Sequence, residues 1–165
     1  MFTVVTRRAG LVLCALALSL PIAALAETPE APPAVPASGI VKVKSAYPVA
    51  ETVARIKRDV AAKGITFFSE VDQQQLAASA GISIGASTLL TFGNPPLGTL
   101  FIRANPVAGL DWPVRVLVLQ DANGDVWAAY TDFGWIARRH DVTGADRDAF
   151  AKASEVIASI TSTIK

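Results

Sequence analysis

The chain has 165 residues, of which 52% are hydrophobic and 18% are charged, and it carries a formal net charge of +1. This near-neutral charge argues against an electrostatic nucleic-acid binder and against a polybasic membrane clamp. A single cysteine and a single histidine argue against a disulfide framework and against a cysteine-rich metal site.

The N-terminal 26 residues have the three parts of a secretory signal peptide. They are a positive start (Arg7, Arg8), an apolar run (residues 11–20) and a small-x-small cleavage site (residues 24–26). The apolar run is short for a bilayer-spanning helix, and an uncleaved anchor is the alternative. Cleavage after Ala26 would remove the only cysteine, Cys14, and would leave 13 basic and 14 acidic side chains. We therefore expect a periplasmic or secreted protein with no membrane attachment after cleavage.

A linker is expected next. Residues 27–39 read ETPEAPPAVPASG, in which four of thirteen residues are proline. Such a composition favours extended polyproline conformations over a packed structure. Residues 40–165 then have the length of one domain.

The domain is expected to begin with a strand and a helix. Residues 40–45 alternate in polarity, as a half-exposed strand does. A helix is expected to open at Pro48 and to end before Gly64. Its apolar stripe at helical spacing consists of Val49, Val53, Ile56 and Val60.

A strand, a short helix and another strand are expected to follow. Residues 65–71 predict a second strand with Ile65, Phe67 and Val71 on one face. Asp72 is placed to cap a short helix over residues 73–80. Residues 87–92 predict a third strand.

The second half of the domain predicts a hairpin followed by helices. Residues 114–119 are apolar at nearly every position, which predicts a strand covered on much of both faces. The loop at 121–125 contains Asn-Gly and predicts a hairpin to a strand over 126–131. A short helix is expected near 135–139, and residues 143–146 resemble a capping box. The face of the final helix is formed by Phe150, Val156, Ile157 and Ile160. This order predicts an α+β fold.

The stretch FGNPPLG, residues 92–98, has two interpretations. In the first it sets backbone geometry: Gly93 permits an unusual dihedral, Asn94 caps a helix that Pro95 begins, and Gly98 permits close packing beneath a neighbour. In the second, Asn94, Thr99 and free helix amides hold a small polar or anionic group. The cap preferences explain most of these residues unaided and favour the first.

Several stretches resemble the domain of unknown function 302 family. They are Glu51-Thr52-Val53, KGITFF at 63–68, FGNPPLGT at 92–99, WPVRVLV at 112–118, NGDVW at 123–127, Tyr130-Thr131-Asp132 and Arg138-Arg139-His140. The resemblance covers roughly residues 40–163. It implies a β-α-β(4)-α fold, an antiparallel sheet packed against helices in an architecture related to the TATA-binding protein, and often a homodimer. The resemblance does not imply DNA binding, and it does not supply an activity.

The sequence offers few groups for catalysis. The family often has a histidine after the aspartate of the second strand, but here glutamines follow Asp72, and an amide is a poor proton shuttle. His140 is the only histidine; we expect it to be structural or exposed, dispensable for folding, and not a tight metal ligand. Gly-x-Ser-x-Gly at 81–85 lacks the strand–turn–helix context of a nucleophile elbow.

Three functions remain open. The favoured one is a non-catalytic, exported binding or interaction domain for an unknown small molecule, without a cofactor, a metal or a nucleic-acid partner, and a homodimer is possible. Its ligand-binding residues are expected to be Asn94, Gly98, Thr99, Tyr130, Asp132 and His140. The alternatives are an enzyme with His140 and Asp132 as an acid/base pair and a purely structural dimeric module.

Overall fold

The computed structural model describes residues 37–143 and 147–165. The expected signal peptide and most of the expected linker lie outside these ranges, as does most of the expected capping box at 143–146. Within the described ranges, no helix is long and apolar enough to cross a membrane.

Five antiparallel strands form one sheet. The strands are β1 (Ile40–Ser45), β2 (Thr66–Asp72), β3 (Ser87–Gly93), β4 (Val114–Gln120) and β5 (Val126–Thr131). Their order across the sheet is β1-β5-β4-β3-β2, so the first strand pairs with the last and β2 lies at the opposite edge. The α+β fold class and the β-α-β(4)-α order are confirmed, with additional short helices inserted between the strands.

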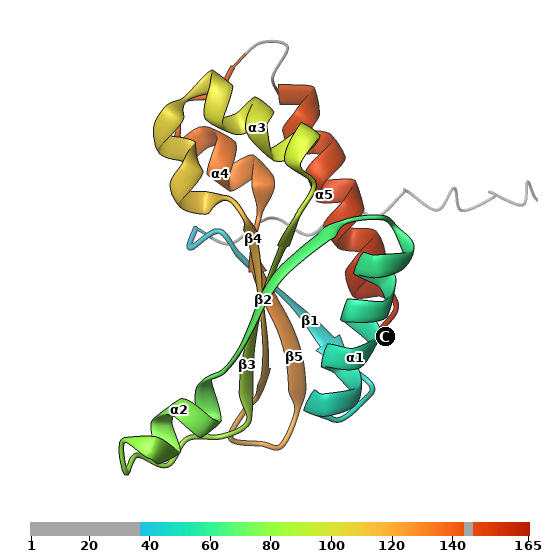
Figure 1. Cartoon of the computed structure of the whole chain (residues 1–165), viewed down its shortest axis with the longest axis vertical. Helices are drawn as coiled ribbons and strands as arrows, with labels where there is room; N and C mark the ends of the chain where they lie inside the picture. The colour runs from blue at the N-terminus through green and yellow to red at the C-terminus, as the bar shows by residue number, and fades with distance from the viewer. Residues whose placement is uncertain (1–36, 144–146) are drawn as a thin grey trace, which may run out of the picture. The chain divides into compact units, whose positions relative to one another are not determined.

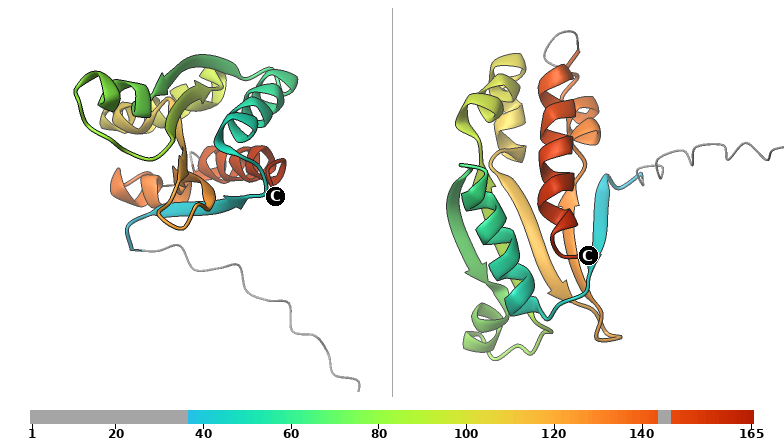
Figure 2. Two further views of the ribbon diagram at one scale, coloured as in Figure 1. Left: turned by 90° about the horizontal axis from the view of Figure 1, so that it is seen from below. Right: turned by 90° about the vertical axis from the view of Figure 1, so that its right-hand side faces the viewer.

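Two long helices cover one face of the sheet, and the short helices gather at its ends (Figures 1 and 2). The helices are α1 (Val49–Ala62), α2 (Gln73–Ser79), α3 (Pro95–Ala104), the 3-10 helix η1 (Pro106–Asp111), α4 (Phe133–Arg139) and α5 (Arg147–Ser162). Helices α1 and α5 are the long pair. Helices α3 and α4 lie with η1 at one end of the sheet, and α2 lies at the other end.

The α1 helix forms for the reasons that the sequence indicates. Its buried side chains include Val53, Ile56 and Val60, three members of the predicted stripe. The helix ends where Gly64 adopts a φ of +64°. The amide of Ile65 then donates to the carbonyl of Val60, which satisfies a carbonyl that the helix leaves open.

The core lies between the sheet and the two long helices. Alternate strand residues face these helices: Leu90 pairs with Val116 and Val118 pairs with Ala128, and all four side chains are fully buried. Phe150, Ile157 and Ile160 of α5 complete this layer, as the predicted face of the last helix requires. Val156, the fourth predicted member, is only partly buried.

Two predictions about strand faces are wrong. The β2 strand carries an irregularity between Phe67 and Ser69, and this extra residue changes which face the following side chains occupy. Phe67 pairs with Phe92 on the helix-covered face, whereas Val71 pairs with Leu89 on the other face. An alternating pattern read across a bulge therefore assigns one of its residues to the wrong side.

The second wrong prediction concerns β4, which the helices cover on one face only. Leu117 lies opposite Leu89 and Ala129 on the open face, and these three side chains are half-buried. Arg115 on the same face is exposed. The apolar run of β4 therefore reflects leucines on an open face rather than a second covering layer.

Candidate functional site

The stretch at 92–98 receives the indole of Trp112, which precedes β4. A Cβ atom added to Gly98 would lie 1.8 Å from Trp112 Nε1, and one added to Gly93 would lie 3.0 Å from the same atom. Gly93 does not have a positive φ, so the unusual dihedral predicted for it is absent. Both glycines are instead places where a large ring approaches the backbone, as the first interpretation expected for Gly98.

The α3 helix begins as the first interpretation states. Asn94 Oδ1 accepts from the amide of Leu97 at 3.2 Å, and Pro95 stands at the first helical position. Pro95 and Pro96 have no N–H, and the amide of Gly98 donates to the carbonyl of Asn94 at 2.8 Å. The first turn thus has no free amide, and the anion site of the second interpretation is not formed.

We expect Asn94→Ala to lower the free energy of unfolding by about 1 kcal/mol, because it removes a helix cap. Thermal and urea melts of the ligand-free protein measure this loss. Thr99→Val is the matched control. The exposed Thr99 hydroxyl donates to the carbonyls of Pro95 and Pro96 in its own helix, so its loss should change stability by less than about 0.5 kcal/mol. Equal melts for Asn94→Ala and the wild type would contradict the capping role.

A pocket of about 350 Å³ lies beside this loop, on the helix-covered side of the sheet. Its aromatic lining consists of Phe92, Phe101, Trp112 and Phe133. Its aliphatic lining consists of Ile65, Leu97, Val114, Ala153, Val156, Ile157 and Ile160. The pocket therefore lies between β3, α3 and α5, and its walls are apolar.

The polar lining of the pocket consists of Lys63, Asn94, Glu155 and Ser159. The Lys63 Nζ atom is 2.8 Å from Asp59, one helical turn earlier in α1. Glu155 and Ser159 are exposed residues of α5. Charges of both signs thus border the pocket, and neither sign dominates.

The structure brings only two of the six predicted ligand residues to this pocket. Asn94 and Gly98 line it. The hydroxyl of Thr99 is occupied within α3. Tyr130 is half-buried on the helix-covered face of β5, where burial raises the pKa of its hydroxyl above 10.0. Asp132 caps α4, since its Oδ1 accepts from the amide of Trp135 at 2.7 Å.

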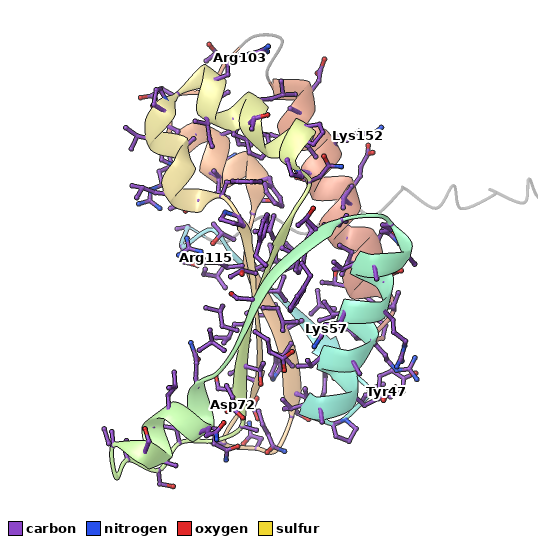
Figure 3. All side chains as sticks on the ribbon, in the orientation of Figure 1. Tyr47, Lys57, Asp72, Arg103, Arg115 and Lys152 are labelled. Atoms are coloured by element: carbon purple, nitrogen blue, oxygen red, sulfur yellow. The ribbon has the colours of Figure 1, made fainter. Side chains whose placement is uncertain are left out.

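His140 is buried and has a partner other than Asp132. Its Nε2 atom lies 2.7 Å from Asp111 Oδ2, and both side chains are 4% exposed. Arg115 and Arg139 also approach Asp111, each at 3.3 Å, and about half of each arginine side chain is in solvent (Figure 3 labels Arg115). The carbonyl of His140 accepts from Asn105 Nδ2 at 2.9 Å.

These contacts join the end of α4 to η1. They indicate a structural histidine rather than an exposed one, and they favour a stabilising role for His140 over the expectation that it is dispensable for folding. The acid/base pair of His140 with Asp132 is not formed, because each side chain is engaged elsewhere. Within the described ranges, no group of three or more His, Cys, Asp or Glu side chains is placed to hold a metal ion.

Most of the residues that line the pocket could not be predicted from local sequence patterns. Trp112 is 14 residues from Gly98 in the chain, and nothing local relates a tryptophan to a distant glycine. The helical spacing of the apolar residues in α5 predicts a core face, because spacing alone does not distinguish a packed face from a pocket wall. The sequence does contain one indication of the site, which is the pair Gly93 and Gly98 on either side of the start of α3. Neither position needs a glycine for its φ angle.

Three comparisons place the chain among known proteins. The family model described as "Domain of unknown function DUF302" matches residues 41–160. Two proteins of Brucella suis and Brucella melitensis, named "Fluoride-specific ion channel FluC 1" and "FluC 2", are 37% identical to this chain over 116 residues. The matched part is 70% of this chain but only 45% and 43% of those relatives, so the chain spans less than half of their length.

A solved structure agrees in fold. It is an uncharacterized conserved DUF302 protein from Bacillus stearothermophilus, with a TM-score of 0.70 at 15% sequence identity. The match covers 78% of this chain and all of the other. At this identity the likeness concerns the fold alone.

Proposed function

The chain belongs to the DUF302 family of domains of unknown function, and from this premise we propose that it is an exported, non-catalytic binding domain. Its ligand site is the apolar pocket between β3, α3 and α5. The observation that carries the proposal is a cavity of about 350 Å³ with four aromatic side chains in its wall. Small-molecule sites are concave, mostly apolar and at least about 300 Å³ in volume.

The acid/base enzyme receives less support than a binding domain. The pocket wall contains no histidine and no aspartate, and its single carboxylate, Glu155, is exposed. A general acid or base works best in a site that shields it from water and in which a second group orients it. The exposed Glu155 does not meet the first condition.

Fluoride conduction is not carried over from the Brucella relatives. Their names describe proteins of which this chain matches less than half. Nothing ties the activity in their names to the part that this chain matches.

Native mass spectrometry of protein purified from the export compartment of its own host tests the binding role. We expect a small molecule to accompany the wild type and to be lost from Val156→Trp, which fills the partly open pocket wall. Val107→Trp is the matched control, because Val107 is 58% exposed in η1 and lies outside the pocket. A co-purified molecule retained equally by both variants would contradict this assignment of the site.

Export has its own prediction. The tripartite pattern of residues 1–26 supports cleavage after Ala26, and the mature protein is expected to begin at Glu27. Intact mass and N-terminal sequencing of the periplasmic fraction measure this. Protein that keeps residues 1–26 and stays in the membrane fraction would overturn the proposal of a free exported domain.

We also propose a homodimer that covers the open face of the sheet. An antiparallel sheet usually presents polar side chains on an open face, but here that face carries Leu89, Leu117 and Leu119. Leu76 of α2 and Ile82 in the loop after it are 59% and 58% exposed at the adjacent end of the sheet. A second copy would remove these apolar surfaces from water.

Sedimentation equilibrium of the mature domain is expected to report a dimer. Ile82→Asp should weaken it at least tenfold, since a charge would then be buried in an apolar contact. Val107→Asp, at an exposed apolar position of η1, should leave the dimer intact. A monomer at millimolar concentration would exclude this assembly.

A further inference from the structure

Among the residues that the structure describes, the Trp112 indole N–H has no acceptor, unlike the other two indoles. Trp127 Nε1 donates to Asp121 Oδ2 at 2.8 Å, and Trp135 Nε1 donates to the carbonyl of Ala37 at 3.2 Å. No acceptor for Trp112 Nε1 is found among residues 37–143 and 147–165, although this atom is not sealed from solvent. The Trp112 ring is partly buried, and the N–H of a buried tryptophan usually finds a hydrogen-bond partner.

This N–H lies at the pocket wall. Trp112 Nε1 is the atom nearest to the Cβ positions of both Gly93 and Gly98, and all three residues line the pocket. The ring of Phe68 meets the Trp112 indole edge-on at 5.8 Å between centroids, which restrains the ring from another side. A molecule in the pocket therefore lies against the indole whose N–H has no acceptor among the residues that the structure describes.

The charges around the pocket point to an uncharged molecule. Lys63 is already paired with Asp59, and Glu155 on α5 supplies the opposite charge. The first turn of α3 offers no amide to an anion, because prolines occupy its first two positions and Asn94 caps the next amide. A buried charge without a partner would be strongly unfavourable in such a wall.

We propose that the pocket takes an uncharged, largely apolar aromatic molecule with one hydrogen-bond acceptor, which receives the Trp112 indole N–H. This inference rests on the proposed function, since it names the ligand class of the same site. The aromatic wall supplies contact area for flat rings, which prefer edge and offset contacts with aromatic side chains. Among molecules of equal shape, the indole N–H favours those that carry a hydrogen-bond acceptor.

Three naphthalenes of similar shape test the inference by isothermal titration calorimetry on the mature protein. They are 2-acetylnaphthalene, which has an acceptor; 2-ethylnaphthalene, which has none; and 2-naphthoate, which is charged. We expect 2-acetylnaphthalene to bind about fivefold more tightly than 2-ethylnaphthalene, the usual effect of one hydrogen bond. We expect 2-naphthoate to bind at least tenfold more weakly than 2-acetylnaphthalene, because its carboxylate would lose water while Lys63, the cation in the pocket lining, is already paired with Asp59.

Trp112→Phe keeps an aromatic ring and removes the N–H. It is expected to lower the affinity for 2-acetylnaphthalene about fivefold and to leave that for 2-ethylnaphthalene unchanged within about twofold. Trp127→Phe, on the open face of the sheet, is the control and should change neither. If Trp112→Phe does not fold, the comparison of the three probes on the wild type still tests whether the ligand is uncharged and carries an acceptor.

The outcomes separate the two proposals. Equal affinities for the acceptor and non-acceptor probes, both abolished by Val156→Trp, would overturn the acceptor claim and leave the binding function intact. Tightest binding of 2-naphthoate would overturn the uncharged-ligand claim in the same way. Binding of no probe to the wild type, or binding that Val156→Trp leaves unaffected, would sink the pocket as the ligand site.

Discussion

Gly98→Ala is expected to lower the free energy of unfolding by about 2 kcal/mol, even though alanine is the better helix former by about 1 kcal/mol. The added Cβ would lie 1.8 Å from Trp112 Nε1 and 2.2 Å from Cε2. These atoms belong to the body of the indole, so the ring cannot avoid the clash by moving a flexible end. The ring must leave its place between α3 and β3, and chemical denaturation measures the loss.

Gly109→Ala is the matched control for this prediction. The nearest atom to a Cβ at Gly109 is 3.8 Å away, which is ordinary contact distance. This change should alter stability by less than about 0.5 kcal/mol. In a Trp112→Ala background, Gly98→Ala should cost little or even stabilise, because the opposing ring is gone and only helix propensity remains. Additive losses in the double variant would contradict the close approach of Gly98 and Trp112.

Asp111→Ala is expected to destabilise the domain by about 3 kcal/mol, because breaking a buried polar pair leaves its partner without a hydrogen bond. The side chains of Asp111 and His140 are each 4% exposed and lie 2.7 Å apart. His140→Ala should have a similar effect, since it leaves the carboxylate buried with only two half-exposed arginines. The unfolding free energy in urea measures both.

Two further variants test whether this cluster acts as described. His140→Gln retains a group that can donate to Asp111, and it should recover part of the loss. Asp125→Ala is the surface control: Asp125 pairs with Lys44 at 2.9 Å with both side chains well exposed, and such pairs contribute about 0–1 kcal/mol. If Asp111→Ala is no more harmful than Asp125→Ala, the buried pair does not stabilise the fold.

Features set by neighbours in the chain could be predicted from the sequence. The apolar stripe of α1, the αL conformation of Gly64 and the caps at Asp72 and Asn94 all depend on residues within one or two turns. The hairpin between β4 and β5, with Gly124 at a φ of +85°, is equally local. Local hydrogen bonds and periodicity determine each of these features, and the order of strands and helices could therefore be predicted from the sequence.

Features set by distant contacts could not be predicted in this way. The bulge at Phe68 depends on the pairing of β2 with β3, and it moved Val71 to the open face. His140 finds its partner 29 residues away in η1. A sequence pattern reports a residue's chemistry and its local spacing, but the choice of partner is a property of the packed fold.

The candidate site shows the same difference between features set by local contacts and features set by distant ones. Asn94 and Gly98 line the pocket, but the ligand interpretation of this stretch requires free amides at α3. The two prolines remove those amides, and a tryptophan from another part of the chain occupies the space beside the glycines. The resulting pocket is mostly apolar, so the ligand that we propose is an uncharged aromatic molecule rather than the small polar or anionic group of the second interpretation.

The central claim is that ligands bind at the wall formed by Trp112. The three tryptophans of this chain give three indole N–H signals in a two-dimensional ¹H–¹⁵N NMR spectrum, which Trp→Phe variants assign. On titration with 2-acetylnaphthalene, the account predicts that the Trp112 signal moves downfield and saturates while those of Trp127 and Trp135 stay in place. A titration in which the Trp112 signal is unmoved, or in which the Trp127 signal moves instead, would contradict it.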